Sequence, residues 1–184
     1  MKSADSDYER SNSIESVDKK RFNTKYMQAV LKTDEDAGKR RKAAQALVDH
    51  LSKLYKINSP KVVITERPRR SFQRGSVSGQ TYGFYRHSGN PAGDTIVIYN
   101  TTAKTGKVVS VKSFADTLLH EFTHHYDTRY LKIDSRHTAG FYKRISSLKD
   151  NLTSAKLDTK EIRSDITDLP VRQLMIGAKG NVGG

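Results

Sequence analysis

Apolar residues recur every three or four positions in three parts of the chain, which predicts amphipathic helices. The first helix is expected over residues 39–55, with basic side chains on the face opposite the apolar one. The strongest pattern begins near Ser113, the expected N-cap, with Asp116 three positions later as an approximate capping box. Its apolar arc consists of Phe114, Ala115, Leu118, Leu119, Phe122 and Tyr126. A third helix is expected from Thr138 to about Leu152.

Three short runs rich in β-branched or aromatic residues predict strands. They cover residues 62–64, 81–85 and 95–99, and residues 88–93 carry the Gly, Asn and Pro signal of a turn. Together with the helices, these runs predict an α+β fold. We expect a small twisted sheet of about three strands packed on the helix that begins near Ser113, with a backing helix and a C-terminal helix.

Length and composition set the domain organisation that we expect. A chain of 184 residues is long enough for one domain with a core and too short for two ordinary ones. Residues 1–38 are Ser-rich and mixed in charge, so we expect a flexible polar lead-in with one short helix over residues 22–31. The folded domain is expected over residues 39–152, followed by a partly disordered C-terminal extension, residues 153–184.

Composition excludes several classes of protein. The chain has no cysteine, which excludes disulfide scaffolds, thiolate metal sites and a cysteine nucleophile. No apolar run approaches the roughly 18 residues that span a bilayer, and the polar start lacks an apolar signal segment. We therefore expect an intracellular, cytoplasmic protein with no membrane partner.

The candidate chemistry lies in the helix expected near Ser113, in the pentapeptide HEFTH that runs from His120 to His124. Two histidines four positions apart project from the same side of a helix, so both imidazoles can bind one cation. Glu121 lies between this pair and the apolar face, where its carboxylate can hold a water molecule without binding the metal itself.

A catalytic zinc site normally needs a third protein ligand and an open fourth position. His125 follows His124 directly and points about 100° away around the helix, which makes it a poor ligand. His137 lies at the start of the next expected helix, and a chain that turns back after the first helix brings it to the metal. We expect His137 as the third ligand, with Asp134 or Asp127 as the alternatives.

The histidines lie in two segments, HEFTHHYD and SRHTAGFYKRI. Together these segments resemble the SprT-like family of zinc metallopeptidases, which includes the Spartan proteases, and the resemblance extends over roughly residues 62–149. In that family the third His has an aromatic residue four positions later, as His137 and Phe141 do here, and Gly where this chain has Thr138. The resemblance implies a zincin-like fold, one Zn²⁺ ion held by the three histidines, and a peptidase activity. The open substrate edge that we expect favours an endopeptidase over an exopeptidase.

The resemblance also implies roles for residues around the metal. Glu121 would be the general base that takes a proton from the activated water and delivers it to the leaving amine. Asp127 would orient a ligand imidazole, and either Tyr142 or Arg144 would stabilise the oxyanion. The substrate would add as a strand to an open edge that precedes the metal helix. The edge candidates are Ile96, Val97 and Ile98.

Positive charge is concentrated between Lys39 and Arg74, where 11 Lys and Arg residues and two acidic residues give +9 of the net +13. Such a segment can follow a phosphate backbone without reading bases, or it can be a solvated basic face. The nucleic-acid candidates are Lys39, Arg40, Arg41, Lys42, Arg67, Arg69 and Arg70. We therefore expect a zinc peptidase that cleaves proteins or peptides, including DNA-associated proteins. The alternative is a non-catalytic nucleic-acid-binding protein with a structural metal.

Overall fold

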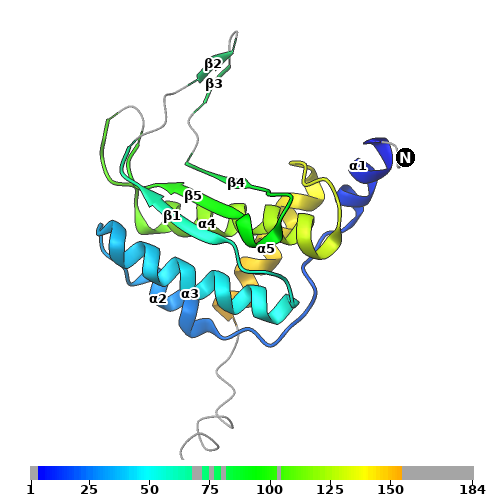
Figure 1. Cartoon of the computed structure of the whole chain (residues 1–184), viewed down its shortest axis with the longest axis horizontal. Helices are drawn as coiled ribbons and strands as arrows, with labels where there is room; N and C mark the ends of the chain where they lie inside the picture. Colours follow the sequence, from blue (N-terminus) through cyan, green and yellow to red (C-terminus); the bar gives the residue numbers. More distant parts are fainter. Residues whose placement is uncertain (1–3, 68–71, 75–76, 80–81, 103–104, 155–184) are drawn as a thin grey trace, which may run out of the picture.

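The computed structural model describes residues 4–67, 72–74, 77–79, 82–102 and 105–154, and this part of the chain has an α+β fold (Figure 1). Five α-helices accompany a three-stranded mixed sheet, and a second pair of strands stands away from it. The predicted fold class is confirmed at this level. The helices are α1 (Ala4–Ser13), α2 (Thr24–Leu31), α3 (Ala37–Tyr55), α4 (Val111–Tyr126) and α5 (Ala139–Ser154). The strands are β1 (Lys61–Thr65), β2 (Phe72–Arg74), β3 (Val77–Gly79), β4 (Gly83–Arg86) and β5 (Thr95–Tyr99).

The central strand of the three-stranded sheet is β5. It pairs in parallel with β1 and antiparallel with β4, so that Ile96 lies opposite both Val62 and Tyr85. The prediction that Ile96, Val97 and Ile98 form an open substrate edge is therefore wrong. An alternating pattern specifies which faces of a strand are buried but not which strands lie beside it. The strand at the edge next to α4 is β4.

One face of the sheet packs against the helices. Ile96 and Ile98 of β5 and Val62 of β1 are buried, and they share one core with Leu47 and Leu51 of α3. All six residues of the predicted apolar arc on α4 are buried in this core as well. The apolar stripe of α4 therefore fixes the rotation of this helix, and the opposite side of α4 carries the residues of the candidate site.

The start of α4 differs from the prediction by one turn. The N-cap is Ser110, whose side-chain oxygen accepts a hydrogen bond from the backbone N–H of Ser113 at 3.2 Å. Ser113 therefore lies inside the helix, and it is paired with Ser110 through a hydroxyl contact of 3.0 Å. Serine is favoured at an N-cap, so the residue type does not distinguish Ser110 from Ser113. In the structure the helix already begins at Val111, which makes Ser110 the cap.

Residues 4–38 differ from the flexible lead-in that their composition predicts. Helix α2 coincides with the one short helix expected there, but α1 is a further helix, and the chain between the two is in contact with the core. Val17, Phe22, Met27 and Val30 are each at most 8% exposed. The mean composition of the segment does not reveal this packing, because a few apolar residues at the contact points are sufficient to hold a largely polar segment against the core.

Some predictions fall outside the described residues: the start of the strand expected at 81–85, and all but the first two residues of the C-terminal extension. Residues 1–3 of the lead-in also lie outside them. None of the described helices combines the length and the apolarity that crossing a bilayer requires.

Candidate metal centre and its cleft

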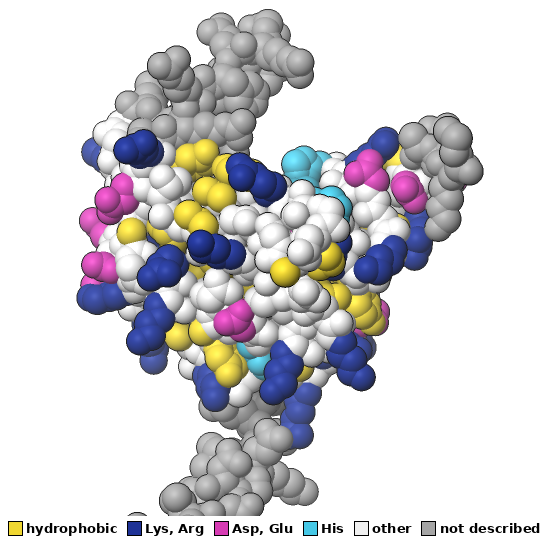
Figure 2. Space-filling view, viewed as in Figure 1, with side chains coloured by type: hydrophobic (Ala, Val, Ile, Leu, Met, Phe, Trp, Pro, Cys, Tyr) yellow, Lys and Arg dark blue, Asp and Glu magenta, His cyan; other side chains and the backbone are white. Residues whose placement is uncertain are grey.

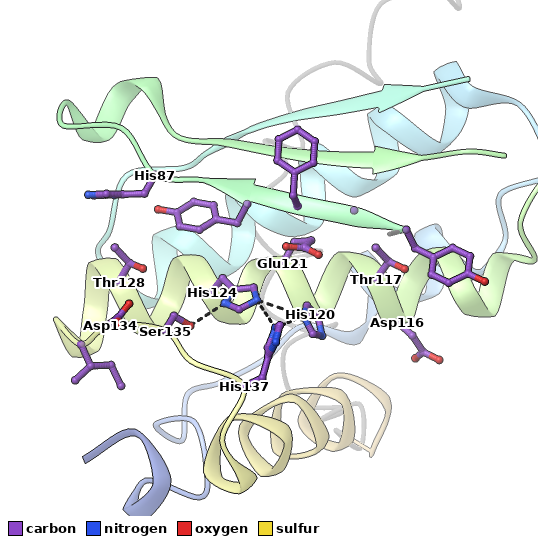
Figure 3. A pocket seen from close by; sticks show the side chains of 15 residues that line it. His87, Asp116, Thr117, His120, Glu121, His124, Thr128, Asp134, Ser135 and His137 are labelled. Atoms are coloured by element: carbon purple, nitrogen blue, oxygen red, sulfur yellow. Dashed lines mark hydrogen bonds between the residues drawn. The ribbon is translucent and has the colours of Figure 1, made fainter. Parts of the chain in front are cut away.

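Three histidine side chains converge beside the outer face of α4 (Figure 3). The Nε2 atoms of His120 and His124 lie 3.2 Å apart, because these residues are one helical turn apart on α4. The Nε2 atom of His137, just before α5, lies 3.1 Å from that of His120 and 3.0 Å from that of His124. The structure thus brings together the three predicted ligands and separates them from the alternatives, since Asp127 faces Arg144 and Asp134 faces Arg136.

The three nitrogen atoms have the arrangement that a tetrahedral zinc site requires. Zn–N bonds of about 2.0–2.1 Å at tetrahedral angles place neighbouring nitrogens about 3.3–3.4 Å apart, which is close to the separations observed. Hydrogen bonds alone cannot hold three such nitrogens together well, because an N–H group on one ring can donate to only one of its two neighbours. Three imidazoles are also a donor set that suits zinc. The residues present therefore fit a metal ion of this kind.

Burial keeps two of these rings neutral, the form that binds a metal. Burial, together with the neighbouring imidazole of His137, lowers the pKa of His120 to about 4. Burial also lowers the pKa of His124 to about 3, and the neighbouring histidines add to the effect. His137 is the exposed member of the group, so the centre opens to solvent on its side.

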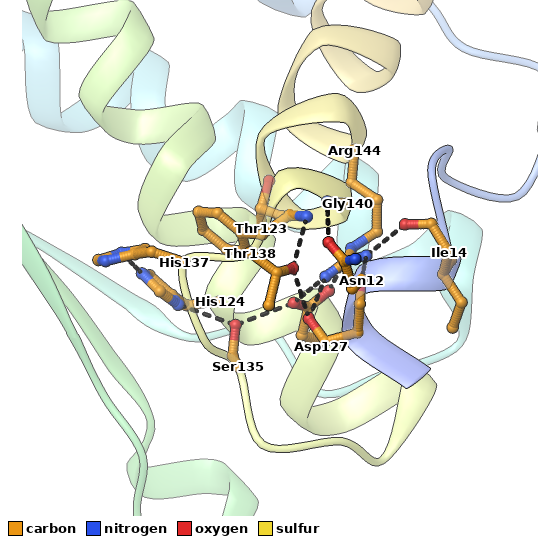
Figure 4. Close-up of polar contacts among 12 residues, drawn as sticks. Asn12, Ile14, Thr123, His124, Asp127, Ser135, His137, Thr138, Gly140 and Arg144 are labelled. Carbon is orange, nitrogen blue, oxygen red and sulfur yellow. Dashed lines mark hydrogen bonds and ion pairs between the residues drawn. The ribbon is translucent and has the colours of Figure 1, made fainter. Parts of the chain in front are cut away.

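A chain of hydrogen bonds sets the tautomer of His124 (Figure 4). The hydroxyl of Ser135 donates to Oδ2 of Asp127 at 2.9 Å, because the carboxylate can only accept. The oxygen of Ser135 is then the acceptor for Nδ1–H of His124, at 2.8 Å. Nε2 of His124 consequently carries its lone pair toward the other two histidines. The predicted orienting role of Asp127 takes this indirect form, and no motif in the sequence pointed to Ser135.

The aromatic residue four positions after His137 packs against the whole triad. The ring centroid of Phe141 lies 4.5 Å from that of His124 and 5.1 Å from those of His120 and His137. Phe141 is fully buried. Its ring therefore restricts the rotamers of all three imidazoles, and it links the position of α5 to the geometry of the centre.

Glu121 lies between α4 and β4, next to the triad (Figure 3). Its side chain is 6% exposed, and burial raises the pKa of its carboxyl group to about 7, although a hydrogen bond from the backbone amide of Tyr85 acts in the opposite direction. The carboxyl group is thus held at the cleft by the edge strand. This is the arrangement expected of a group that exchanges a proton near neutral pH.

The strand β4 approaches α4 closely because of a glycine. A Cβ atom at Gly83 would lie 2.7 Å from Cγ2 of Thr117 and 3.2 Å from Cγ of Glu121. The carbonyl of Tyr82 accepts from the amide of Tyr99 in β5. In an antiparallel pair only every second residue bonds the partner strand. Because Tyr82 bonds β5, the backbone groups of Gly83 and Tyr85 point away from β5. No other described strand pairs with that outer edge.

The triad, Glu121 and β4 line an open cleft of about 860 Å³. One wall is the edge strand with Tyr82 and Tyr85, and the facing wall is the segment between α4 and α5, with Ile133 and Ser135. Tyr142 of α5 lies beside the centre, with its ring 6.0 Å from that of His137, and its side chain is 54% exposed.

The other oxyanion candidate, Arg144, is not at the cleft, which corrects the prediction for this residue. Its side chain is fully buried, and its guanidinium donates to both carboxylate oxygens of Asp127, at 2.9 and 2.7 Å. The remaining N–H groups donate to the carbonyls of Ser11 and Ile14 and to the hydroxyl of Ser11. A buried, fully bonded cation cannot reach a substrate, so Arg144 acts through Asp127.

A second polar network holds the loop between β4 and β5, and no sequence pattern predicts it. The buried carboxylate of Asp94 accepts two hydrogen bonds from Arg129, at 2.7 Å each, one from the hydroxyl of Tyr85 at 2.7 Å, and one from the amide of Ser88 at 2.9 Å. His125 packs against Tyr85 in the same region. The network joins the edge strand to the chain that follows α4, and its members are too far apart in sequence to form a motif.

The basic segment is not one continuous surface. Arg40 is 2% exposed, and its Nη1 atom donates to Oδ1 of Asn100 at 2.8 Å and to the carbonyl of Val109 at 2.9 Å, so its place among the nucleic-acid candidates is wrong. Figure 2 shows Lys and Arg side chains spread over one face and interleaved with acidic ones. The exposed candidates are Lys39, Arg41, Lys42 and Arg67, whereas Arg69 and Arg70 lie outside the described residues.

Comparisons of the chain with protein-family models, with curated proteins and with solved structures find no match.

Proposed function

We propose that this protein is a zinc-dependent metallopeptidase with a zincin-like fold, similar to the SprT-like family. The observation that carries the proposal is the triangle of Nε2 atoms from His120, His124 and His137, 3.0–3.2 Å apart, beside the buried carboxylate of Glu121. A structural zinc site would be closed by a fourth protein ligand. Among the described residues, the metal-binding group consists of these three histidines, and it opens into a cleft.

A zinc ion held by the three Nε2 atoms would supply a Lewis acid that activates a water molecule and polarises the scissile carbonyl. The carboxylate of Glu121 takes the proton of the attacking water and then delivers it to the nitrogen of the leaving amine. Ser135 and Asp127 keep Nδ1 of His124 protonated, which leaves Nε2 available to the cation. The phenol of Tyr142 is the remaining candidate for a group that stabilises the oxyanion, since Arg144 is buried.

The substrate is an extended polypeptide that pairs with the outer edge of β4. The backbone groups of Gly83 and the carbonyl of Tyr85 face away from β5 beside the cleft, whereas the amide of Tyr85 already bonds the carboxyl group of Glu121. Pairing through the backbone aligns a peptide over the triad with little dependence on its side chains. An unfolded protein is therefore the substrate of choice for a first assay.

The test compares wild type with Glu121→Gln for bound zinc and for cleavage of an unfolded protein. Gln has the shape of Glu but cannot accept the proton, so we expect one zinc ion per chain in both proteins and a loss of cleavage of at least about 100-fold in the variant. The matched control is Glu66→Gln, the same change at an exposed position, which should retain wild-type activity.

Two outcomes would contradict the proposal. Cleavage that survives in Glu121→Gln would remove the assigned mechanism. A wild-type protein that binds zinc and DNA but cleaves nothing would favour the non-catalytic nucleic-acid-binding protein. A protease directed at DNA-associated proteins predicts in addition that DNA stimulates cleavage at low salt and that the stimulation disappears near about 0.3 M salt.

A further inference from the structure

The segment from Arg10 to Asp18 is fastened to the part of the chain that carries the third ligand (Figure 4). Nη2 of Arg10 donates to the carbonyl of Leu131 at 3.0 Å, in the link that precedes His137. At the far end of the segment, the amide of Asp18 donates to the hydroxyl of Tyr126 at the end of α4, at 3.1 Å. We call residues 10–18 the N-terminal clamp.

The centre of the clamp lies against the first turn of α5. The hydroxyl of Ser11 is 3.1 Å from that of Thr138, which directly follows His137 and also accepts from the amide of Phe141. A Cβ atom at Gly140 would overlap the backbone carbonyl oxygens of Ser11 and Asn12. The two segments are thus in backbone contact, and glycine is required for it. Thr138 stands where the SprT-like family usually has Gly, and the clamp gives this hydroxyl a partner.

A second connection leads from the clamp to the other side of the triad. The carbonyls of Ser11 and Ile14 accept from the guanidinium of Arg144, which holds the carboxylate of Asp127. Asp127 in turn accepts from Ser135, and Ser135 accepts from His124. Carbonyls at the C-terminal end of a helix lack partners within it and favour a cation, so the docked clamp stabilises Arg144 in this position. Each contact in this second connection is 2.9 Å or less, and the carboxylate of Asp127, which can only accept, sets the direction of the bonds from Arg144 and Ser135.

We propose that the N-terminal clamp is a regulatory latch on the metal centre: its docking holds His137 and His124 in the geometry that retains zinc, and its release lets zinc dissociate. The inference rests on the proposed metal centre. A protein that displaces residues 10–18, or a protease that cuts within them, would switch the centre off without touching a ligand.

Gly140→Ala is the sharpest variant for a test, because it adds one methyl group against the clamp backbone and removes no hydrogen-bonding group. Alanine favours a helix over glycine by roughly 0.5–1 kcal/mol, so the change does not weaken α5 by itself. We expect zinc release to a chelator to be about tenfold faster than in wild type. Trypsin should also cut faster at Arg10, Lys19 and Lys20. The matched control is Gly89→Ala, where a Cβ atom meets nothing within 4 Å.

Ser11→Ala is the second variant, for the case that Gly140→Ala does not fold. It removes the hydroxyl that meets Thr138 and Arg144, and it should accelerate zinc release less than Gly140→Ala does. Val48→Ala, a core change in α3, tests whether loss of stability alone accelerates release, and it should not.

Three results would overturn the latch. In the first, the clamp is freed while the rate of zinc release stays at the wild-type value. In the second, neither the tryptic pattern nor zinc release changes in a folded Gly140→Ala protein. In the third, Val48→Ala accelerates release as much as the clamp variants. A wild-type protein that binds no zinc would instead contradict the proposed function itself.

Discussion

Two aspartate–arginine pairs support the two walls of the cleft, and they differ in what surrounds them. Asp127 and Arg144 lie on the α5 side, and both side chains are fully buried. Asp94 and Arg129 lie on the β4 side, where the aspartate is fully buried and the arginine side chain is 12% exposed. The first pair supports a metal ligand through Ser135, and the second supports the edge strand through Tyr85.

The two carboxyl groups respond differently to burial. Burial raises the pKa of Asp127 above its usual value, because the hydrogen bonds from Arg144 and Ser135 do not fully offset it. Burial acts on Asp94 in the same direction, but the hydrogen bonds from Arg129, Tyr85 and the Ser88 amide outweigh it and leave the pKa of Asp94 below its usual value. Asp127 accepts one hydrogen bond besides those of its arginine, whereas Asp94 accepts two. Removal of the arginine is therefore expected to cost most at Asp127, and the charge of Asp94 contributes to stability.

The largest effect is expected from Arg144→Met, which leaves Asp127 buried without its cation. Breaking a buried ion pair from one side costs about 3–5 kcal/mol, so the free energy of unfolding should fall by that amount. The measurement is urea denaturation of both proteins in the presence of a chelator, so that bound metal does not contribute. A loss below about 1 kcal/mol would mean that the pair does not organise this wall.

The double variant Asp127→Leu/Arg144→Met separates stability from positioning. Apolar residues of similar size in place of a buried ion pair often restore stability, so we expect much of the loss to be recovered. Zinc affinity should stay low, because Ser135 then lacks its acceptor and no longer fixes the tautomer of His124. A double variant that regains both stability and zinc affinity would argue that the hydrogen bonds from Asp127 through Ser135 do not position His124.

A smaller effect, about 2 kcal/mol, is expected from Asp94→Asn, which weakens all four hydrogen bonds to this side chain. Because the folded pKa of Asp94 is lowered, its stabilising contribution is present above the unfolded value of about 4 and is lost as the pH falls. The difference in unfolding free energy between wild type and variant should therefore be largest near neutral pH and shrink below about pH 4. Denaturation series across this range check it, and a difference independent of pH would contradict the assignment. For peptide cleavage we expect KM to rise more than kcat falls.

The smallest effect is expected from Ser135→Ala, which removes one hydroxyl from the support of His124. Loss of such a partner typically lowers metal affinity at least about tenfold, or about 1.4 kcal/mol. Competition with a chelator measures this, with Ser113→Ala in the first turn of α4 as a control at a distance from the triad. An unchanged affinity would show that packing against Phe141 alone orients the ring.

The sequence predicts helices α2 to α5, the strands of the three-stranded sheet and the centre of the site, but not α1, β2 or β3. The apolar periodicity of α4 placed His120 and His124 on its open side, since residues four positions apart on a helix share a face. The short spacing from His124 to His137 allowed a single turn of the chain, which is why the third ligand was predictable as well. These inferences depend on local geometry, and local geometry is repeated from protein to protein.

Packing in three dimensions determines which residues support these parts. It placed β5 in the centre of the sheet, buried Arg40 and Arg144, and fastened residues 10–18 to α5. Strand order, burial of a charge and contacts between segments more than 100 positions apart depend on how elements pack. No spacing along the chain encodes them, because a long side chain of Arg can lie in water or donate to a buried carboxylate, and the surrounding fold alone selects between the two.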